Sequence, residues 1–404
     1  MLRALGYDNL AVFHMNEGHS ALLTTALLEE EVGARGEEGV TPEAVEQVRQ
    51  RCVFTTHTPV PAGHDQFDRG LVQQLLDART VQLTEQAEGF TDGVLNMTHL
   101  ALRLSRYANA VALRHGQVSR EMFPGYPIAA ITNGVHAVTW VADPMKDLFD
   151  RHIPGWRLDP VAFRHAIGIP ATELRRAHET AKWSAIESIR QRTGAALDPN
   201  VLTIGFARRA ARYKRAELVF SDVARLRQIA QHVGPIQFLI AGKAHPADEM
   251  AKATIRHVHE AAAQLKGAVQ VVYVEDYNMS LARDLVAGVD LWLNNPQRPL
   301  EASGTSGMKA AMNGVPSLST LDGWWIEGHV EGVTGWSIGT SWDPAPDEKD
   351  AEQLYSKLEM VVAPMYYRQP ERWAEVMRYA IALNGSFFNA QRMVMQYAQE
   401  AYRL

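Results

Sequence analysis

Short apolar runs alternate with longer helical patterns along nearly the whole chain. Runs of this kind are typical of buried strands, and the patterns between them have the spacing of amphipathic helices. The predicted strands lie at 10–15, 52–56, 108–113, 128–132, 201–207, 236–242, 269–275 and 290–294. Strands that alternate with helices form parallel sheets with helices on both faces. The alternation therefore predicts an α/β fold.

The region 141–199 interrupts this alternation with the segments DPMKDLF and HIPGWRLDP and a long helical stretch from Ala171 to about Gly194. A chain of 404 residues is long enough for two or three domains. We therefore predict two Rossmann-like domains, 1–140 and 141–404, that face a cleft. The last fifty residues are expected to be helical, with about 371–404 crossing back towards the first domain.

Helices are expected between the predicted strands. Their patterns cover 20–32, 42–50, 71–78, 98–108 and 280–288, with further helices after Tyr213 and after Pro246. Thr41 and Pro42 have the residue types of an N-cap and a first helical position, so we expect the helix at 42–50 to begin there.

Composition excludes several classes of protein. The chain has 40 basic and 46 acidic residues, so its net charge of −6 provides no general basic field for nucleic acid. The single cysteine, Cys52, can form neither an internal disulfide nor a cysteine-rich zinc site. No run of 18 apolar residues is present, so no membrane span is expected. We expect a cytoplasmic protein.

Polar residues follow nearly every predicted strand, where parallel sheets bind their ligands. The histidines in these segments are His14, His19, His57 and His64. Their spacing matches no zinc motif, and they could equally serve as hydrogen-bond donors from separate loops. We therefore predict no metal site.

The segment RRAARYKR, residues 208–215, has five positive charges in eight residues. A run of this kind is usually the solvated face of a helix. This one follows a predicted strand directly and stands where we expect a helix to begin, and a helix N-terminus favours anions. Its position favours an anion site.

The segment EASGTSGMK, residues 301–309, has small residues that run into a helical pattern. Read by itself, it is either a Gly-Ser turn leading to a capped helix or a loop whose amides cradle a phosphate. A lysine fixed beside such a loop, as Lys309 is, suits a Schiff base to pyridoxal phosphate.

Taken together, these segments resemble the α-glucan phosphorylases (glycogen, starch and maltodextrin phosphorylase), particularly the short bacterial type. The resemblance runs over essentially the whole chain. Its motifs occur in the family's order as FHMNEGHSALL, FTTHTPVPAGHDQF, ITNGVHAVTW, ARRAARYKR, VEDYNMSLARDLVAGVDLWL and EASGTSGMKAAMNGVPSLSTLDGWWIEG. The resemblance implies a GT-B fold. It also implies cleavage of the terminal α-1,4 bond of a glucan by inorganic phosphate, which releases glucose 1-phosphate with retained configuration.

The resemblance also implies pyridoxal 5′-phosphate as cofactor, with its phosphate group taking part in the reaction. It gives the cofactor contacts as Lys309 (the Schiff-base lysine), Arg208, Thr305, the amide of Gly304, and Tyr277. It gives the pair that holds substrate phosphate as Arg209 and Lys214, and the glucose contacts as Glu301, Ser303, Gly304, His57, Asn133, Glu17 and His19.

The mechanism that the resemblance implies agrees with simple electrostatics. Two phosphates held close repel each other, so cationic side chains are needed beside them. Their proximity raises the basicity of one phosphate, which can then pass a proton to the glycosidic oxygen. No pair of protein carboxylates is required, unlike in glycoside hydrolysis.

The chain departs from the family's pattern at three places. Ala211 stands where longer members often have a bulkier polar residue, and Gly307 replaces an asparagine common before the Met-Lys pair. The family's first strand units, with a glycine-rich loop that contacts both phosphates, have no counterpart before Met15. We therefore expect the first domain to be incomplete at its N-terminus.

Two other functions stay open at this point. One is a nucleotide-sugar-dependent GT-B glucosyltransferase, which would share the fold and a basic Arg/Lys pair. The other is a truncated, inactive protein that binds glucan. A homo-oligomeric assembly stays open as well.

Overall fold

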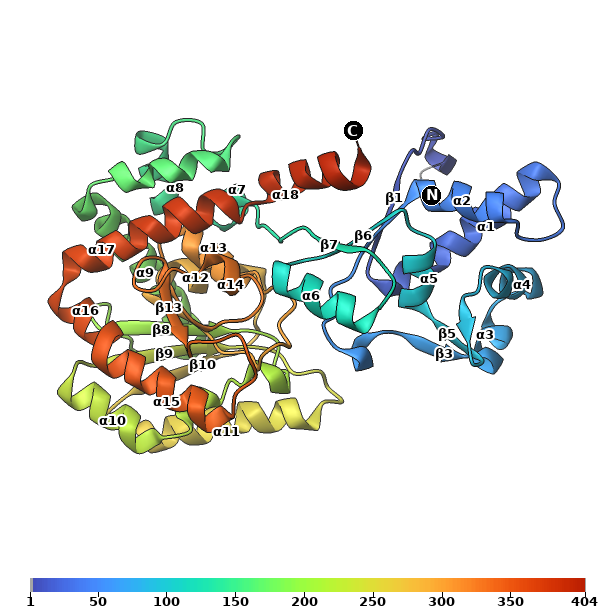
Figure 1. Cartoon of the computed structure of the whole chain (residues 1–404). Coiled ribbons are helices and arrows are strands. Elements are labelled where there is room, and N and C mark those ends of the chain that lie inside the picture. The colour runs from blue at the N-terminus through green and yellow to red at the C-terminus, as the bar shows by residue number, and fades with distance from the viewer. Residues whose placement is uncertain (1–2, 404) are drawn as a thin grey trace. The chain divides into compact units, whose positions relative to one another are not determined.

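The computed structural model describes residues 3–403, apart from the side chains of Arg3 and Ala62 (Figure 1). The chain divides into two compact units. Unit 1 is the described part of Met1–Thr132 and Val394–Leu404, and unit 2 is Asn133–Met393. The domain bounds that the sequence suggests, 1–140 and 141–404, stay a prediction.

Unit 1 has a four-stranded sheet in the order β1-β2-β6-β7, with every neighbouring pair parallel. Its strands are β1 (Phe13–Asn16), β2 (Cys52–Thr55), β6 (Tyr107–Ala110) and β7 (Ile128–Ala130). A small antiparallel sheet, which the sequence patterns did not predict, is formed by β3 (Gln66–Asp68), β4 (Phe90–Thr91) and β5 (Val94–Asn96). The helices are α1 (Leu22–Arg35), α2 (Pro42–Arg51), α3 (Arg69–Leu75), α4 (Ala78–Gln86), α5 (Met97–Arg103) and α6 (Leu113–Met122).

The N-terminus of α2 confirms the predicted cap. The hydroxyl of Thr41 accepts a hydrogen bond from the amide of Ala44 at 3.3 Å, and Pro42 occupies the first turn. Both features relieve the donors that the first turn of a helix leaves without a partner.

The last residues of the chain pack into unit 1 through buried polar side chains. α18 (Ala390–Gln396) continues into a π-helical turn, Tyr397–Tyr402. The Tyr402 hydroxyl lies 2.7 Å from His14 Nδ1, and the Tyr397 hydroxyl accepts from Asn109 Nδ2 at 3.0 Å. These contacts join the end of the chain to β1 and β6.

Several predicted boundaries in unit 1 are wrong: the strand predicted for 108–113 ends at Ala110, and the helix predicted for 71–78 ends at Leu75. The first strand begins at Phe13 and not at residue 10. The helix predicted for 98–108 ends at Arg103, and β6 begins at Tyr107. The apolar spacing continues through this region, but the amide of Arg106 donates to the carbonyls of Arg49 and Cys52. The backbone there already belongs to the junction with α2 and β2.

Unit 2 has a six-stranded parallel sheet in the order β10-β9-β8-β11-β12-β13. The strands are β8 (Leu202–Ala207), β9 (Ile236–Ala241), β10 (Gln270–Val274), β11 (Leu291–Asn294), β12 (Ser317–Thr320) and β13 (Gly335–Ile338). The apolar runs predicted the first four. They did not predict β12 and β13, because three of the four residues of SLST are polar and two of the four of GWSI are glycine or serine, although both strands are buried throughout.

Helices cover both faces of this sheet (Figure 1). Along β9, Phe238 and Ile240 join one hydrophobic cluster with α10 (Val223–His232) and α11 (Glu249–Leu265). Leu239 and Ala241 join another with α9 (Ala171–Thr193) and α12 (Met279–Gly288). The other helices of the unit are α7 (Ala137–Trp140), α8 (Asp143–His152), α13 (Ser306–Met312), α14 (Trp325–Gly328), α15 (Asp347–Lys357), α16 (Ala363–Arg368) and α17 (Pro370–Tyr379). The predicted α/β class is confirmed.

The helix expected at the basic segment 208–215 is absent from that position. The segment contains only a 3₁₀ turn, Arg212–Lys214, and the next α-helix is α10, which begins at Val223. Arg215 has a φ of +51°, and its guanidinium donates to the carbonyl of Asn295 and the carboxylate of Asp350. The chain turns at Arg215 to make these buried contacts, so the segment loses the support that a helix N-terminus would give to an anion.

Within residues 3–403, none of the helices has both the length and the apolar character that crossing a membrane requires.

Candidate functional site

A buried cluster of charged side chains lies at the carboxyl end of β8. Glu301 Oε2 accepts hydrogen bonds from Lys214 Nζ at 2.5 Å and from Arg208 Nη2. All three residues are at least nine-tenths buried. Burial by itself would raise the pKa of Glu301, but the charges of Arg208 and Lys214 hold that pKa below its ordinary value.

A second carboxylate supports the backbone of this cluster. Asp322 follows β12, and its two oxygens accept from the amides of Glu301 and Gly323, each at 2.9 Å. Burial raises the pKa of Asp322 to about 7. The sequence analysis missed this residue because it missed β12. The rule that polar residues follow strands would have found it once that strand was recognised.

The cluster has cationic donors that its carboxylate does not satisfy. Arg208 Nη1 is buried and has no hydrogen-bond partner among the described residues. Burial and the neighbouring charge of Arg208 lower the pKa of Lys214 to about 7. Arg209 is exposed and forms no ion pair within the described part of the chain. A buried guanidinium nitrogen without an acceptor is costly, so this cluster is suited to an anion.

The three predicted cationic residues of this segment are brought together. Arg208, Arg209 and Lys214 line one small cavity of about 20 Å³ at the carboxyl ends of β8 and β9. Gly242, after β9, also lines it, and a side chain there would meet the carbonyl oxygen of Arg208 at 2.4 Å.

The loop that follows Glu301 depends on close backbone packing. Gly304 has a φ of +71°, and a Cβ on Gly323 would lie 2.3 Å from the carbonyl oxygen of Ser303. A Cβ on Gly307 would lie 2.7 Å from the ring of Trp324. The Trp324 ring therefore gives a physical reason for glycine at 307, where the family often has asparagine.

Lys309 stands on α13, directly after this loop. Its Nζ lies 3.8 Å from the centre of one ring of Trp140, and burial lowers the pKa of Lys309. Lys309 forms no ion pair with a carboxylate of the described residues. A partly buried amine with a lowered pKa and no counter-ion is suited to react with a carbonyl group.

Asn313 fixes the relation between Lys309 and Trp140. Its Nδ2 donates to the carbonyls of Lys309 at 2.9 Å and Trp140 at 2.8 Å, and its Oδ1 accepts from the amide of Ala142 at 2.8 Å. Asn313 is fully buried, so these bonds hold α13 against the end of α7. The sequence analysis assigned no role to either Trp140 or Asn313.

The other two predicted cofactor contacts lie beside these elements. Thr305 precedes α13 and makes no side-chain cap bond to it. Tyr277 follows β10 and is half-buried; burial raises its pKa, while the charge of Arg208 opposes the rise.

In unit 1, Glu17 and His57 meet at the carboxyl ends of β1 and β2. Glu17 Oε2 accepts from the amide of His57 at 2.7 Å and from the hydroxyl of Thr58 at 2.9 Å, and Glu17 Oε1 accepts from the amide of Gly18 at 2.9 Å. Glu17 has a φ of +84°, a conformation that costs about 1–3 kcal/mol for residues other than glycine. The three hydrogen bonds hold the residue in it.

His19 lies exposed on the 3₁₀ turn Gly18–Ser20 that follows Glu17. Asn133 belongs to unit 2, and its carbonyl accepts from Arg392 Nη2 at 3.1 Å. The joint role of Asn133 and His57 at one sugar hydroxyl therefore stays a prediction.

Three of the histidines considered as metal ligands have protein partners, among them His57, whose Nε2 lies 2.5 Å from Asn16 Oδ1. His14 Nε2 lies 2.8 Å from Thr55 Oγ1, and His64 Nδ1 lies 2.9 Å from Thr98 Oγ1. Residues 3–403 contain no group of three or more histidine, cysteine or acidic side chains placed to hold a metal ion.

Two Rossmann-like units, with polar and charged residues gathered at the carboxyl ends of their parallel strands, define an α/β protein of the kind that binds ligands at such edges. Residues 80–333 match the family model of carbohydrate phosphorylases. The chain belongs to this family, whose fold class is GT-B, as the sequence predicted.

The chain is similar over its length to several curated proteins. It is 41% identical to a maltodextrin phosphorylase of Thermococcus litoralis, an alignment that covers 100% of this chain and 52% of that protein. It is 38% identical to a glycogen phosphorylase of Mycobacterium tuberculosis, with 97% of this chain and 51% of that protein covered. It is 36% identical to a glycogen phosphorylase of Aquifex aeolicus, with 100% and 64% covered. The chain thus spans about half to two-thirds of the length of these relatives.

Proposed function

We propose that this chain acts as an α-1,4-glucan phosphorylase, which transfers the terminal glucose of an α-glucan to inorganic phosphate and gives glucose 1-phosphate with retention. Family membership supports the reaction class. The observation that carries the proposal is the buried cluster of Arg208, Lys214 and Glu301, because one guanidinium nitrogen of Arg208 has no acceptor among the described residues. A phosphate oxygen is an acceptor suited to that nitrogen.

The proposal includes pyridoxal 5′-phosphate. When bound, this cofactor would supply a phosphate group that exchanges protons during the reaction. The residues present fit it: Lys309 provides a partly buried amine without a counter-ion, and Arg208 provides the unsatisfied donor. We assign its remaining contacts to the amide of Gly304, Thr305 and Tyr277.

Substrate phosphate is assigned to Arg209 and Lys214. In the structure described here Lys214 and Arg208 bind Glu301 instead. An anion that takes these donors would release the carboxylate of Glu301, which could then accept hydrogen bonds from sugar hydroxyls. We assign the 3- and 4-hydroxyls of glucose to Glu301, Ser303 and Gly304.

The remaining glucose contacts are assigned to Glu17, His19, His57 and Asn133. The hydrogen bonds between Glu17 and the segment at His57 support a shared role for those two residues. A cytoplasmic location is part of the proposal, and a homo-oligomeric state is left to experiment.

Cofactor binding is tested by absorbance. The chain is purified in the presence of pyridoxal 5′-phosphate, dialysed, and compared with Lys309→Ala and with Lys243→Ala. Lys243 is an exposed lysine paired with Asp276 at 3.0 Å, so it is a matched control. We expect the Lys309→Ala variant to lose the bound chromophore and the Lys243→Ala variant to keep it. A Lys309→Ala variant that absorbs like the wild type contradicts the assignment.

Activity is tested by release of glucose 1-phosphate from maltoheptaose, with and without inorganic phosphate. A nucleotide sugar with maltotetraose as acceptor forms the second arm. Phosphate-dependent release supports the proposal, and chain extension from the nucleotide sugar supports a glucosyltransferase instead. Glucan binding with neither reaction would identify an inactive binding protein.

A further inference from the structure

Unit 1 has a cavity at the edge of its parallel sheet opposite to Glu17 and His57. It lies at the amino ends of β6 and β7, where Arg106 precedes β6 and Pro127 precedes β7, and it has a volume of about 230 Å³. Small-molecule sites typically have volumes of about 300–1,000 Å³, so this cavity is suited to a compact group. No residue assigned to the phosphorylase reaction lines it.

Three arginines and no acidic residue line this cavity. Arg49 belongs to the last turn of α2, Arg103 ends α5, and Arg106 lies between α5 and β6. The other lining residues are neutral, namely Leu102, Ser105, Ala108, Gly125, Tyr126 and Pro127. Because arginine keeps its proton in proteins, the lining has three positive charges in a chain whose net charge is −6.

The carboxylates that pair with two of these arginines stand outside the lining and in solvent. Arg103 Nη2 lies 2.7 Å from Glu88, whose side chain is 69% exposed, and Arg49 Nη1 lies 3.4 Å from Glu46, which is 50% exposed. Exposed ion pairs are weak because water screens the two charges. These carboxylates therefore leave most of the positive charge of the cavity uncompensated.

Arg106 has no carboxylate partner within the described residues. Its Nη2 donates to the carbonyl of Tyr402 at 3.3 Å, a neutral acceptor near the end of the chain. Burial and the neighbouring charge of Arg403 lower the pKa of Arg106. Both causes act against the charged form, so a negative charge at this place would be stabilised.

The segment 103–106 also contains polar atoms that the protein does not satisfy. Arg103 Nε, Arg106 Nε and Ser105 Oγ are buried and have no hydrogen-bond partner among the described residues. Glu88 and Tyr402 each accept from an Nη2 group, and neither takes the Nε donor of the same guanidinium. A buried donor without an acceptor is costly. Acceptor oxygens are what this segment lacks.

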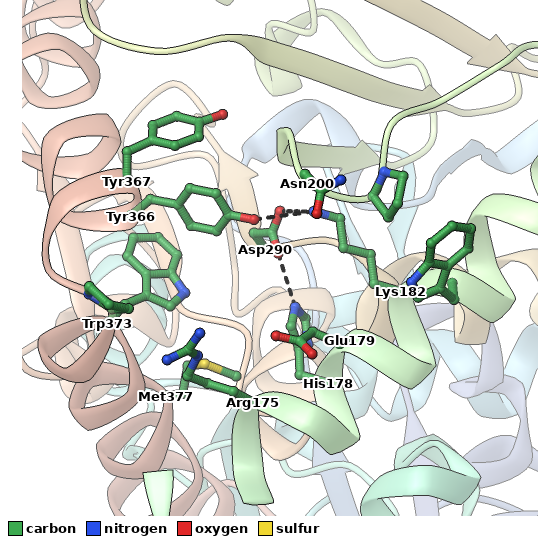
Figure 2. Close-up of a pocket in the computed structure, with 13 residues that line it drawn as sticks. Arg175, His178, Glu179, Lys182, Asn200, Asp290, Tyr366, Tyr367, Trp373 and Met377 are labelled. Carbon is green, nitrogen blue, oxygen red and sulfur yellow. Dashed lines mark hydrogen bonds and ion pairs between the residues drawn. The ribbon is translucent and has the colours of Figure 1, made fainter. Parts of the chain in front are cut away.

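A cavity at the amino edge of the sheet in unit 2 has the opposite charge balance. It lies between α9 and the helices α16 and α17 and has a volume of about 480 Å³ (Figure 2). Arg175 and Lys182 line it, but so do Glu179 and Asp290. Lys182 Nζ lies 2.6 Å from the Asp290 carboxylate, and the side chains of both residues are at most 3% exposed. Its buried charges are thus neutralised within the protein, whereas those of the unit 1 cavity are not.

We propose that the unit 1 cavity binds a phosphate group, either as inorganic phosphate or as the end of a phosphomonoester, at a site separate from the reaction centre. Phosphate accepts several hydrogen bonds at once and pairs with arginine in a bidentate geometry. A dianion also balances three guanidinium groups better than a single carboxylate does. The site does not depend on the proposed reaction, since none of its residues takes part in it.

The test is hydrogen exchange of the full chain, read by mass spectrometry of its peptides. Exchange is compared in inorganic phosphate, in glucose 1-phosphate, and in sodium chloride of equal ionic strength. Peptides that cover 102–108 and 125–127 report on the cavity. Peptides that cover 208–215 and 301–309 report on the proposed reaction centre, so binding at the two places is measured separately.

The variants are Arg103→Gln and Arg49→Gln, with Arg35→Gln as matched control. Arg35 also belongs to unit 1, lies 2.9 Å from a single carboxylate, and does not line the cavity. Its side chain is 33% exposed, against 35% for Arg103. Exchange of β2 without ligand, together with circular dichroism, verifies that each variant is folded.

We expect phosphate to slow exchange at 102–108 and 125–127 where sodium chloride does not. Arg103→Gln and Arg49→Gln should each raise the dissociation constant about tenfold, because each removes a charged donor. Arg35→Gln should stay close to wild type. Slowing by phosphate and glucose 1-phosphate alike supports a site for the phosphate group itself, and slowing by one of them alone identifies the free anion or the monoester as its ligand.

The site is overturned if neither ligand slows exchange at the cavity, or if sodium chloride slows it equally. It is also overturned if both cavity variants keep the wild-type dissociation constant, or if Arg35→Gln loses as much affinity as they do. Slowing at the cavity without any change at 208–215 would keep this site and contradict phosphate binding at the proposed reaction centre. Slowing at 208–215 alone would do the opposite.

Discussion

Glu17 in unit 1 and Glu301 in unit 2 are both carboxylates at the carboxyl edge of a parallel sheet, but different donors hold them. Glu17 is bound by two backbone amides and a hydroxyl, all of them neutral. Glu301 is bound by the two cations Arg208 and Lys214. Neutral donors fix the shape of a loop and leave no charge over. Two cations against one carboxylate leave positive charge in a buried place, which an anion can use.

The largest difference between the units is expected when each carboxylate becomes an amide. Glu301→Gln leaves two buried cations without a counter-ion, at a cost of about 3–5 kcal/mol in the free energy of unfolding of unit 2. Glu17→Gln keeps one acceptor oxygen for its neutral donors and should cost about 1 kcal/mol in unit 1. Native-state hydrogen exchange of β8 and of β2 measures the two units separately. Equal losses in the two variants would contradict the contrast.

The units are also expected to respond to pH in opposite directions. In unit 1, burial lowers the pKa of His115 to about 4 from the ordinary 6.5. The unfolded chain then binds the proton more readily, so unit 1 loses stability as the pH falls from about 6.5 to 4. In unit 2, burial raises the pKa of Asp322 to about 7 from 3.8. The folded chain binds that proton more readily than the unfolded chain, so unit 2 loses stability as the pH rises from about 4 to 7.

Each contribution is on the order of 3 kcal/mol, because a pH unit is worth about 1.4 kcal/mol for one group. Hydrogen exchange of β2 and β8 across pH 4–8 measures both slopes. His115→Gln should flatten the slope in unit 1 alone, and Asp322→Asn the slope in unit 2 alone. If His115→Gln leaves the dependence of stability on pH unchanged in unit 1, or Asp322→Asn leaves it unchanged in unit 2, other groups set that dependence.

The smallest loss of stability is expected when a helix cap is removed, and it should be the same in both units. Thr41 caps α2, and Asn278 Oδ1 caps α12 by accepting from the amide of Leu281 at 3.1 Å. Either residue changed to alanine should cost about 1 kcal/mol, because a cap acts within one helical turn. Thermal unfolding compared with the same hydrogen-exchange probes measures both. A cost in one unit several times that in the other would show that the cap also supports tertiary contacts.

Much of the fold could be predicted from local patterns. The apolar runs predicted β8, β9, β10 and β11 to within one or two residues, and Thr41 and Pro42 predicted the start of α2. The same patterns failed for β12 and β13, because a strand with polar residues or glycine can still be buried when tertiary packing covers it, as it does even for β13 at the edge of the sheet. The helix expected at 208–215 failed because Arg215 turns the chain to reach Asp350.

Some features of the candidate site also follow from the sequence alone, and others depend on the tertiary structure. The sequence by itself determined which residue types follow each strand: Glu17 after the first, Arg208 and Lys214 after β8, and the small-residue loop before Lys309. Only the tertiary structure decided that Glu301, 93 positions from Arg208, binds that arginine. It also decided that Asp322 supports Glu301, that Trp140 lies over Lys309, and that a cavity opens at the other edge of the sheet. Residue type follows from the chain alone. Burial and pairing depend on the order of the strands, and in unit 2 that order places β11 beside β8 and β12 beside β11.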